Sequence, residues 1–241
     1  MQKPIALVAA MREELDALLV RFPAHDARTH FNTPLYHARH NGQDLVITQS
    51  GVGKVNAACT LTLLLSDFNP GCVINTGCAG GLGAGQRILD LAVPEQVAYT
   101  DVDITPLGFE YGQMMGSAPR FNASLRLLTH LRAVLDGYAP TVTCHHGLLG
   151  SSDAFIHQRE QIERIRRHFG DAVRCVDMEG GAIAHACTRF NVPFLILRVL
   201  SDLPEQGGNA PDFQAFLTRA SALSADLCRN LVNRLALQES L

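Results

Sequence analysis

Short apolar runs rich in β-branched residues alternate along this chain with longer stretches of helical periodicity. Strands are predicted at Ile5–Ala9, Leu45–Gln49, Cys72–Asn75, Leu91–Val97, Gly147–Gly150, Val173–Val176 and Phe194–Leu200. Helices are predicted at Arg12–Val20, Lys54–Leu65, Ala123–Leu135, Gln158–Phe169, Gly181–Phe190 and Gln214–Leu235. This alternation is typical of an α/β protein whose sheet is covered by helices on both faces. The predicted fold therefore has three α/β/α layers around a central mixed, mostly parallel sheet.

The chain shows no sign of a division into domains. Its 241 residues are 47% hydrophobic, which is enough for one large core. No Pro/Ser-rich linker, low-complexity tract or repeat separates its parts, so we expect a single domain over residues 1–241. The segment Thr100–Ala118 carries Gly, Pro and aromatic residues without a clear period. A long loop of this kind is expected to serve function or an interface.

Charge and cysteine content favour a cytoplasmic protein that acts on a small molecule. Charged residues make up 18% and the formal net charge is −3, which favours neither nucleic acid nor a membrane surface as partner. Arg12, Glu13 and Glu14 interrupt the apolar N-terminal stretch, and no segment has the ~20 apolar residues of a membrane span. Seven cysteines without a CxxC pair argue against a disulfide framework. Neither they nor the histidines have ligand spacing, so we expect no metal.

Three acidic residues follow predicted strands. Glu14 comes after IALVAAM, Glu179 after VRCVDM and Asp202 after FLILRVLS. Ligands of open α/β sheets bind beyond the carboxyl ends of the strands, so these carboxylates are candidate site residues. Any one of them is equally well explained by helix capping or by the helix dipole. Three at the ends of separate strands favour a shared site.

Two glycine-rich segments also follow predicted strands. Ser50–Asn56 is suited to holding a ligand on its backbone N–H groups, but it lacks the third Gly of a dinucleotide fingerprint and is not a Walker motif. Asn75–Gly81 would let a planar ligand approach the backbone, or would simply form a tight turn between a strand and a helix. A dinucleotide cofactor is therefore the weaker interpretation.

Six ordered motifs resemble those of a known family: AMREEL, SGVGKVNAA, INTGCAGGL, SSDAFI, VDMEGGAIAH and RVLSD. They are similar to the motifs of the 5′-methylthioadenosine/S-adenosylhomocysteine nucleosidases, within the purine nucleoside phosphorylase superfamily, from Ile5 to the C-terminal helix. The resemblance implies a nucleoside phosphorylase-like fold, a homodimer and no cofactor. It also implies hydrolysis of methylthioadenosine and S-adenosylhomocysteine to adenine and a 5-substituted ribose, with 5′-deoxyadenosine as a further expected substrate.

The resemblance assigns a role to each of the three acids. Asp202 matches the general acid that protonates purine N7, which requires burial or coupling to raise its pKa. Glu14 matches the carboxylate that positions and activates water. Glu179 matches the residue that holds the ribose hydroxyls and favours an oxocarbenium-like transition state, with Met178 packed against the sugar.

Other residues of the same motifs are expected to line the rest of the pocket. Phe155 resembles the aromatic side chain that stacks on adenine, although core packing would explain it equally well without the motif. Ile156 resembles the neighbour whose backbone reads the purine edge. The remaining expected substrate contacts are Cys78, Ala79, Gly80 and Ser201, then Met11, Val52 and Phe213 at the 5′-alkylthio group, and Ile104, Leu107 and Phe109 from the second subunit.

A few positions depart from the family pattern. Cys78 stands where Ser is usual, and Asp177 stands where Glu is usual. Leu107 and Phe109 replace larger or hydroxylated aromatics. The change to Cys78 affects a hydrogen bond near the ribose or water, and the last two changes affect the 5′-pocket. The preference among methylthioadenosine, S-adenosylhomocysteine, 5′-deoxyadenosine and aminodeoxyfutalosine therefore stays open.

Two other functions are alternatives: a purine nucleoside phosphorylase of the same superfamily, and a non-catalytic relative that binds or stores nucleosides. The presence of all three acids disfavours the second. Water is preferred to phosphate because hexameric phosphorylases of this fold carry an Arg where this chain has Asn75, and a phosphate dianion needs cationic donors. Lys54, the only basic residue of the first glycine-rich loop, is expected to point to solvent, and Glu14 would repel phosphate.

Overall fold

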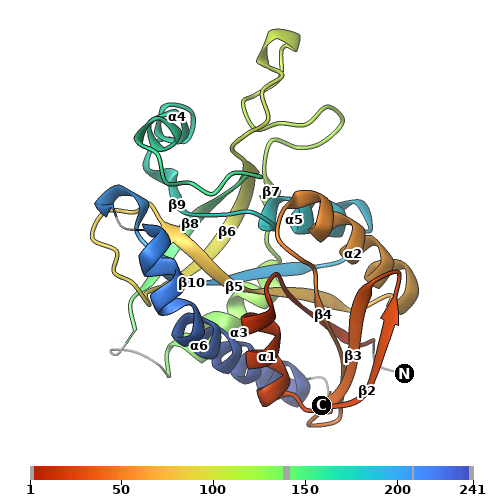
Figure 1. Ribbon diagram of the computed structural model, residues 1–241. Helices are drawn as coiled ribbons and strands as arrows, with labels where there is room; N and C mark the ends of the chain where they lie inside the picture. Colours follow the sequence, from red (N-terminus) through yellow and green to blue (C-terminus); the bar gives the residue numbers. More distant parts are fainter. Residues whose placement is uncertain (1–2, 138–141, 208, 239–241) are drawn as a thin grey trace.

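The computed structural model describes residues 3–137, 142–207 and 209–238, and a ten-stranded mixed sheet forms its centre (Figure 1). The strands are β1 (Ile5–Ala9), β2 (Ala24–His30), β3 (Thr33–His40), β4 (Gln43–Gln49), β5 (Cys72–Gly81), β6 (Leu91–Tyr99), β7 (Phe121–Asn122), β8 (Cys144–Ser151), β9 (Val173–Asp177) and β10 (Phe194–Asp202). Their order in the sheet is β10-β6-β8-β9-β5-β1-β4-β3-β2, with β7 paired to β6. Because β5 also pairs with β10, the strands β5, β10, β6, β8 and β9 close into a ring.

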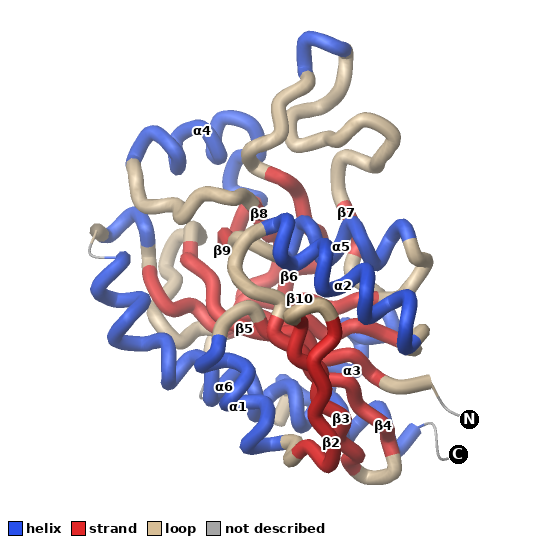
Figure 2. The backbone as a smooth tube through the Cα atoms, turned by 45° about the vertical axis from the view of Figure 1, so that its right-hand side comes forward, coloured by secondary structure: helices blue, strands red, loops and turns tan. Residues whose placement is uncertain are grey.

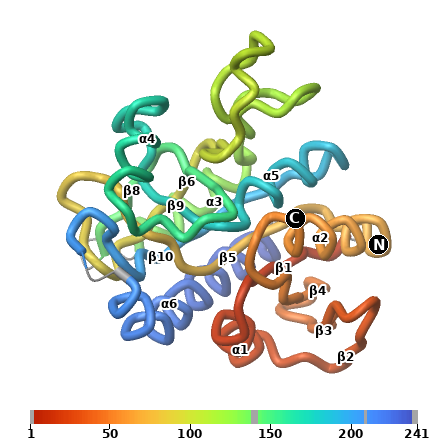
Figure 3. Tube along the Cα trace, turned by 45° about the horizontal axis from the view of Figure 1, so that its top comes forward, coloured from red at the N-terminus to blue at the C-terminus, as the bar shows by residue number. Residues whose placement is uncertain are grey.

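Helices cover both faces of this sheet, so the predicted three-layer α/β/α fold is confirmed (Figure 2). On one side α1 (Arg12–Arg21) and α3 (Leu125–Leu135) pack against α6 (Asn209–Gln238), which lies over β5 and β10. On the other side α2 (Lys54–Phe68) and α5 (Gly180–Arg189) lie side by side (Figure 3). α4 (Arg159–Phe169) packs on β9, and short 3-10 helices occupy Thr105–Leu107, Gly170–Ala172 and Pro204–Gln206. None of the helices within the described ranges has the length and apolar character needed to cross a membrane.

Burial on both faces explains the apolar sequences of the central strands. Every residue of β1 and of β10 is buried. β1 pairs in parallel with β4 and β5, and β10 pairs in parallel with β5, so their carboxyl ends gather at one edge. The end of β9 reaches the same place from the other half of the ring, where Gly80 pairs with Val176 and Gly81 with Cys175. This convergence of strand ends positions the site described below.

The alternation pattern does not predict the hairpin formed by β2 and β3. β2 lies at the edge of the sheet and is largely exposed, so its sequence AHDARTH shows no apolar periodicity. The connecting residues Phe31 and Asn32 have φ angles of 47° and 60°. Two consecutive positive φ angles are typical of a tight hairpin turn, but this one lacks the Asn-Gly or Asp-Gly pair that identifies such turns in a sequence.

The second glycine-rich segment is strand and not a turn between a strand and a helix. β5 continues to Gly81, so the segment Asn75–Gly81 lies within it. The small residues serve close packing, because a Cβ added at Gly77 would collide with the Glu14 carboxylate, and one at Gly81 would lie 2.7 Å from a Leu203 methyl carbon. The absence of side chains here lets α1 and the end of β10 approach the strand.

Residues 100–118 extend away from the sheet as a long irregular segment (Figure 1). Its base is held in place because Tyr111 stacks on His168, with ring centroids 3.7 Å apart, and donates a hydrogen bond to the Thr100 carbonyl at 3.0 Å. The tip exposes three large apolar side chains, those of Leu107, Met114 and Met115. The segment is therefore anchored at its base and apolar at its tip.

Candidate active site

A cavity of about 240 Å³ lies where the carboxyl ends of β1, β5, β9 and β10 converge. Its lining includes these residues singled out from the sequence: Met11, Glu14, Val52, Cys78, Ala79, Gly80, Phe155, Ile156, Met178, Glu179, Ser201, Asp202 and Phe213. The structure does not bring Ile104, Leu107 and Phe109 to this cavity, because all three lie on the 100–118 segment. Ala10, Ala154, Val176 and Asp177 also line it.

Glu14 is held at the start of α1 by three backbone N–H groups. Its Oε2 accepts hydrogen bonds from Ala10 and Met11, at 2.9 and 3.0 Å, and its Oε1 accepts one from Cys78 at 2.9 Å. The side chain is buried, and burial raises its pKa, whereas the charge of Arg198 and the N–H donors act in the opposite direction. These donors favour the ionised form of a buried carboxylate.

Glu179 is the N-cap residue of α5 and its carboxylate reaches across to the first glycine-rich loop. It accepts a hydrogen bond from the Gly53 N–H at 2.9 Å. Burial raises the pKa of Glu179 to about 8, with a further contribution from the negative charge of Asp177. The loop therefore fixes the orientation of a carboxylate that takes up a proton more readily than an exposed Glu.

Asp202 ends β10 inside the cavity. Only 2% of the residue is exposed, and the Ser201 hydroxyl lies 2.8 Å from its Oδ1. Gly80 makes room for the carboxyl group, since a Cβ at that position would lie 3.1 Å from Oδ2. The side chain is thus fixed in direction and shielded from water, as a group that donates a proton to a bound ligand must be.

Aromatic side chains lie at another part of the cavity. The rings of Phe155 and Phe213 meet edge to face, with centroids 6.0 Å apart. Phe155 is 38% exposed, so it is not packed as an ordinary core residue. An exposed aromatic face inside a cavity is suited to stacking on a planar ligand.

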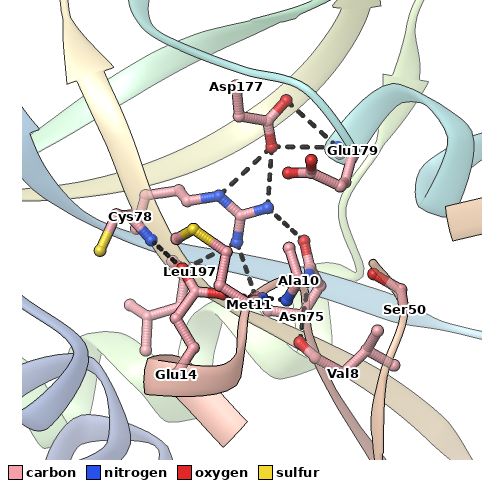
Figure 4. Close-up of polar contacts among 12 residues, drawn as sticks. Val8, Ala10, Met11, Glu14, Ser50, Asn75, Cys78, Asp177, Glu179 and Leu197 are labelled. Carbon is pink, nitrogen blue, oxygen red and sulfur yellow. Dashed lines mark hydrogen bonds and ion pairs between the residues drawn. The ribbon is translucent and has the colours of Figure 1, made fainter. Parts of the chain in front are cut away.

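A buried guanidinium, that of Arg198, contacts Asp177 of the cavity lining, and the functional interpretation of the sequence missed it (Figure 4). Arg198 donates to Asp177 Oδ2 through Nε at 3.2 Å and Nη2 at 2.8 Å, and it also donates to the carbonyl and amide oxygens of Asn75. Asp177 in turn accepts from the Gly180 N–H and so caps α5. Arg198 lies in the middle of an apolar strand, within the RVLSD motif. A charged residue at such a position was the signal that could have revealed it.

Of Asn75 and Cys78, only Cys78 lines the cavity. Asn75 is buried within the sheet, where it donates to the Val8 carbonyl at 2.9 Å, and it does not line the cavity. Its identity therefore says little about phosphate binding. The Cys78 thiol lies 4.0 Å from the Ser221 hydroxyl, and burial raises its pKa well above the ordinary value. The thiol is protonated at neutral pH.

The charged groups of the cavity lining are all carboxylates. Glu14, Asp177, Glu179 and Asp202 line it, and among the residues that the structure describes no Lys, Arg or His does so. Lys54 does not enter the cavity, but its ammonium group is not simply solvated, because it forms an ion pair with Asp101 at 2.7 Å. Neither residue lines the cavity. No group of His, Cys, Asp or Glu side chains within the described ranges is arranged to hold a metal ion.

Comparisons with known proteins agree with this architecture. The family model of the Phosphorylase superfamily matches residues 4–233. The 5′-methylthioadenosine/S-adenosylhomocysteine nucleosidase of Exiguobacterium is 37% identical over 235 residues, which cover 96% of this chain and 98% of that protein. The corresponding protein of Anoxybacillus flavithermus is 36% identical over 231 residues, covering 96% and 98%.

Solved structures of nucleosidases superimpose on nearly the whole chain. The enzyme of Neisseria meningitidis, in complex with methylthio-immucillin-A, has a TM-score of 0.90 at 33% identity, covering 95% of this chain and 98% of that one. The Colwellia psychrerythraea enzyme, in complex with adenine, has a TM-score of 0.91 at 30% identity, covering 98% and 96%. The chain therefore belongs to the Phosphorylase superfamily and, within it, to the 5′-methylthioadenosine/S-adenosylhomocysteine nucleosidases.

Proposed function

We propose that this protein hydrolyses the N-glycosidic bond of 5′-methylthioadenosine and S-adenosylhomocysteine, and also that of 5′-deoxyadenosine. The products are adenine and the 5-substituted ribose. One observation carries the proposal: the cavity is mainly apolar and is lined by the carboxylates of Glu14, Glu179 and Asp202. Within the described residues, carboxylates are the only charged groups in the lining. Support also comes from two relatives of the same fold, whose structures hold adenine and methylthio-immucillin-A.

Each of the three acids acts on a different reactant group: the purine, the attacking water or the sugar. Asp202 donates a proton to purine N7, so that the bond between N9 and C1′ breaks with the electron pair leaving on a neutral adenine. Glu14, held in place by its N–H donors, takes a proton in its ionised form from the water that attacks C1′. Glu179 holds the ribose hydroxyls, and in its ionised form it stabilises the positive charge that develops on the sugar.

The apolar part of the cavity suits the rest of the substrate. Phe155 stacks on adenine, and the backbone of Ile156 contacts the purine edge. Met11, Val52 and Phe213 offer apolar contacts to a 5′-alkylthio group. The substrate is therefore bound by its purine and thioether ends while the bond to be cleaved lies among the acids.

The reaction is expected to proceed equally well without phosphate. A phosphate dianion needs cationic donors in a site poor in water, and no Lys, Arg or His lines this cavity in the described part of the chain. Methylthioadenosine should therefore release adenine in phosphate-free buffer, and with saturating phosphate the sugar product should still be free methylthioribose. Mass analysis of the sugar provides the measurement.

Other outcomes of this assay would favour the alternatives. A phosphorylated sugar, or a rate that rises with phosphate, would identify a phosphorylase. Tight binding of methylthioadenosine without adenine release would identify a nucleoside-binding protein.

A homodimer belongs to the proposal, with Ile104, Leu107 and Phe109 of one subunit completing the 5′-pocket of the other. Support comes from the exposed tip of the 100–118 segment, where 64% of Leu107 and 60% of Met115 are accessible. Apolar patches of this kind on a single chain are typical of an interface. Light scattering should give about twice the chain mass of 26.2 kDa.

Charged substitutions at the tip provide the check. The double variant Leu107→Asp, Met115→Asp should become monomeric and lose activity, whereas Val20→Asp, at an exposed apolar residue of α1, should do neither. A monomeric wild-type protein with full activity would refute both the interface and the shared pocket. We also propose a cytoplasmic location, supported by seven cysteines, none of which forms a disulfide.

A further inference from the structure

Three loops, two of which line the cavity, meet at one ammonium group, that of Lys54. Its Nζ lies 2.8 and 2.7 Å from the two carboxylate oxygens of Asp101 and 3.7 Å from Asp153 Oδ2. The Lys54 N–H donates to Asp153 Oδ1 at 2.7 Å, and the Asp153 N–H donates to Asp101 Oδ2 at 2.9 Å. Each of the three residues is thus bonded to both others, and they form a closed triangle.

Two corners of the triangle are next to parts of the cavity lining, and the third lies at the start of the 100–118 segment. Lys54 follows Gly53, whose N–H donates to Glu179 at 2.9 Å. Asp153 precedes Phe155 by two residues in the loop after β8. Asp101 lies in the 100–118 segment, next to its start. The triangle therefore joins the loop that orients Glu179, the loop that carries Phe155, and the segment assigned to the subunit interface.

The geometry differs from that of an ordinary surface ion pair, which contributes little. The side chains of Lys54 and Asp101 are 20% and 24% exposed, that of Asp153 is 51% exposed, and Nζ lies 5.0 Å from the centroid of the Tyr99 ring. Two of the contacts are made by backbone N–H groups, so the triangle fixes main-chain positions and not only side chains. Gly53 adopts a φ of 96°, and a Cβ there would lie 3.3 Å from Asp153 Oδ1, so the loop fits the triangle closely.

We propose that Lys54 is a positioning residue for nucleoside cleavage, acting through Asp101 and Asp153. It holds the Gly53 amide against Glu179 and holds the loop of Phe155 over the purine. The inference rests on the function proposed above. Without the ammonium group the two backbone hydrogen bonds remain, but the two carboxylates face each other with no cation between them, which weakens the contact between the loops. Substrate binding then weakens more than the chemical step, because Asp202 and Glu14 lie on other elements.

Replacing Lys54 with Met keeps the length of the side chain and removes its charge. Lys54→Met is expected to lower kcat/KM about 10- to 100-fold, mostly by raising KM. A loss of this size is expected when a supporting loop is displaced by about 1 Å. Lys54→Arg should recover most of the loss because the charge is restored. The matched control is Arg21→Met, which breaks an ion pair to Asp226 at a residue whose side chain is also 20% exposed, between α1 and α6. The control should lose thermal stability to a similar degree and keep its KM.

Amide hydrogen exchange on the ligand-free protein tests the same idea independently of turnover. In Lys54→Met, residues 51–54, 101–103 and 152–156 should exchange faster, with the rest of the chain unchanged. The proposal is overturned if KM stays within about twofold of wild type, an effect far below that expected of a displaced loop. It is equally overturned if exchange in the three loops does not change. A wild-type protein that fails to release adenine would contradict the proposed function, and the exchange result would still decide the role of Lys54.

Discussion

Asp202→Asn is expected to lower kcat by about 10²- to 10⁴-fold, the usual contribution of a general acid, while the fold is retained. The amide has the shape of the carboxyl group and can still accept a hydrogen bond from Ser201, which lies 2.8 Å from Oδ1. It has no acidic proton to give to purine N7. Steady-state release of adenine from methylthioadenosine, with circular dichroism to verify the fold, provides the measurement.

The control for this variant is Glu205→Gln, which removes a carboxylate three residues further along the chain. Glu205 lies outside the cavity and forms an ion pair with Arg166 at 2.7 Å. Its replacement should leave kcat within about twofold, as for a surface ion pair. If Asp202→Asn kept more than about a tenth of the wild-type kcat, the role of general acid would be wrong, since that loss is far below the usual contribution.

Glu14→Gln is expected to lower kcat by a similar factor, about 10²- to 10⁴-fold, because the amide cannot take a proton from water. Some stability should also be lost. The two carboxylate oxygens accept three backbone N–H groups, from Ala10, Met11 and Cys78, and the NH₂ group of Gln must face at least one of those donors. A buried donor left without an acceptor costs about 1–3 kcal/mol.

Glu13→Gln separates the two effects because Glu13 is the exposed neighbour of Glu14 on the same helix. It should change neither kcat nor the melting temperature. Thermal unfolding and kinetics are to be measured on both variants at a temperature where each is folded. A Glu14→Gln protein that is fully folded and retains nearly wild-type kcat would rule out Glu14 as the base.

The elements that face the core could be predicted from the sequence. β1 runs over the predicted residues Ile5–Ala9, and the predicted helices α1, α2 and α3 begin or end close to the observed bounds, because burial on one or both faces imposes a period on the sequence. The edge strand β2 carries no such pattern because water covers much of its surface, and its neighbour β3 is only partly buried. β10 extends to Asp202, beyond the predicted end at Leu200. The prediction stopped at Leu200 because the polar residues Ser201 and Asp202, at the end of a strand that enters a cavity, resemble the start of a loop.

Long-range side-chain contacts could not be predicted from the local pattern. Arg198 and Asp177 are 21 residues apart and lie within 2.8 Å of each other only because β10 and β9 belong to the same ring of strands. Lys54 and Asp101 are separated by 47 residues. An isolated Lys after a glycine-rich loop is ordinarily solvated, so no sequence rule identified its partner.

The closed ring of strands also determines when, during folding, the cavity first exists. β5 must accept β10 as a neighbour, and that pairing joins Val73 to Phe194, which are more than a hundred residues apart in the chain. Contacts between such distant segments form late, because closing a long loop costs entropy before any contact offsets it. Glu14 leaves the ribosome well before Asp202, which follows it by most of the length of the sheet-forming sequence. An unfinished chain therefore holds most of its sheet without a place for a nucleoside, and any ligand of this cavity can act only on the completed fold.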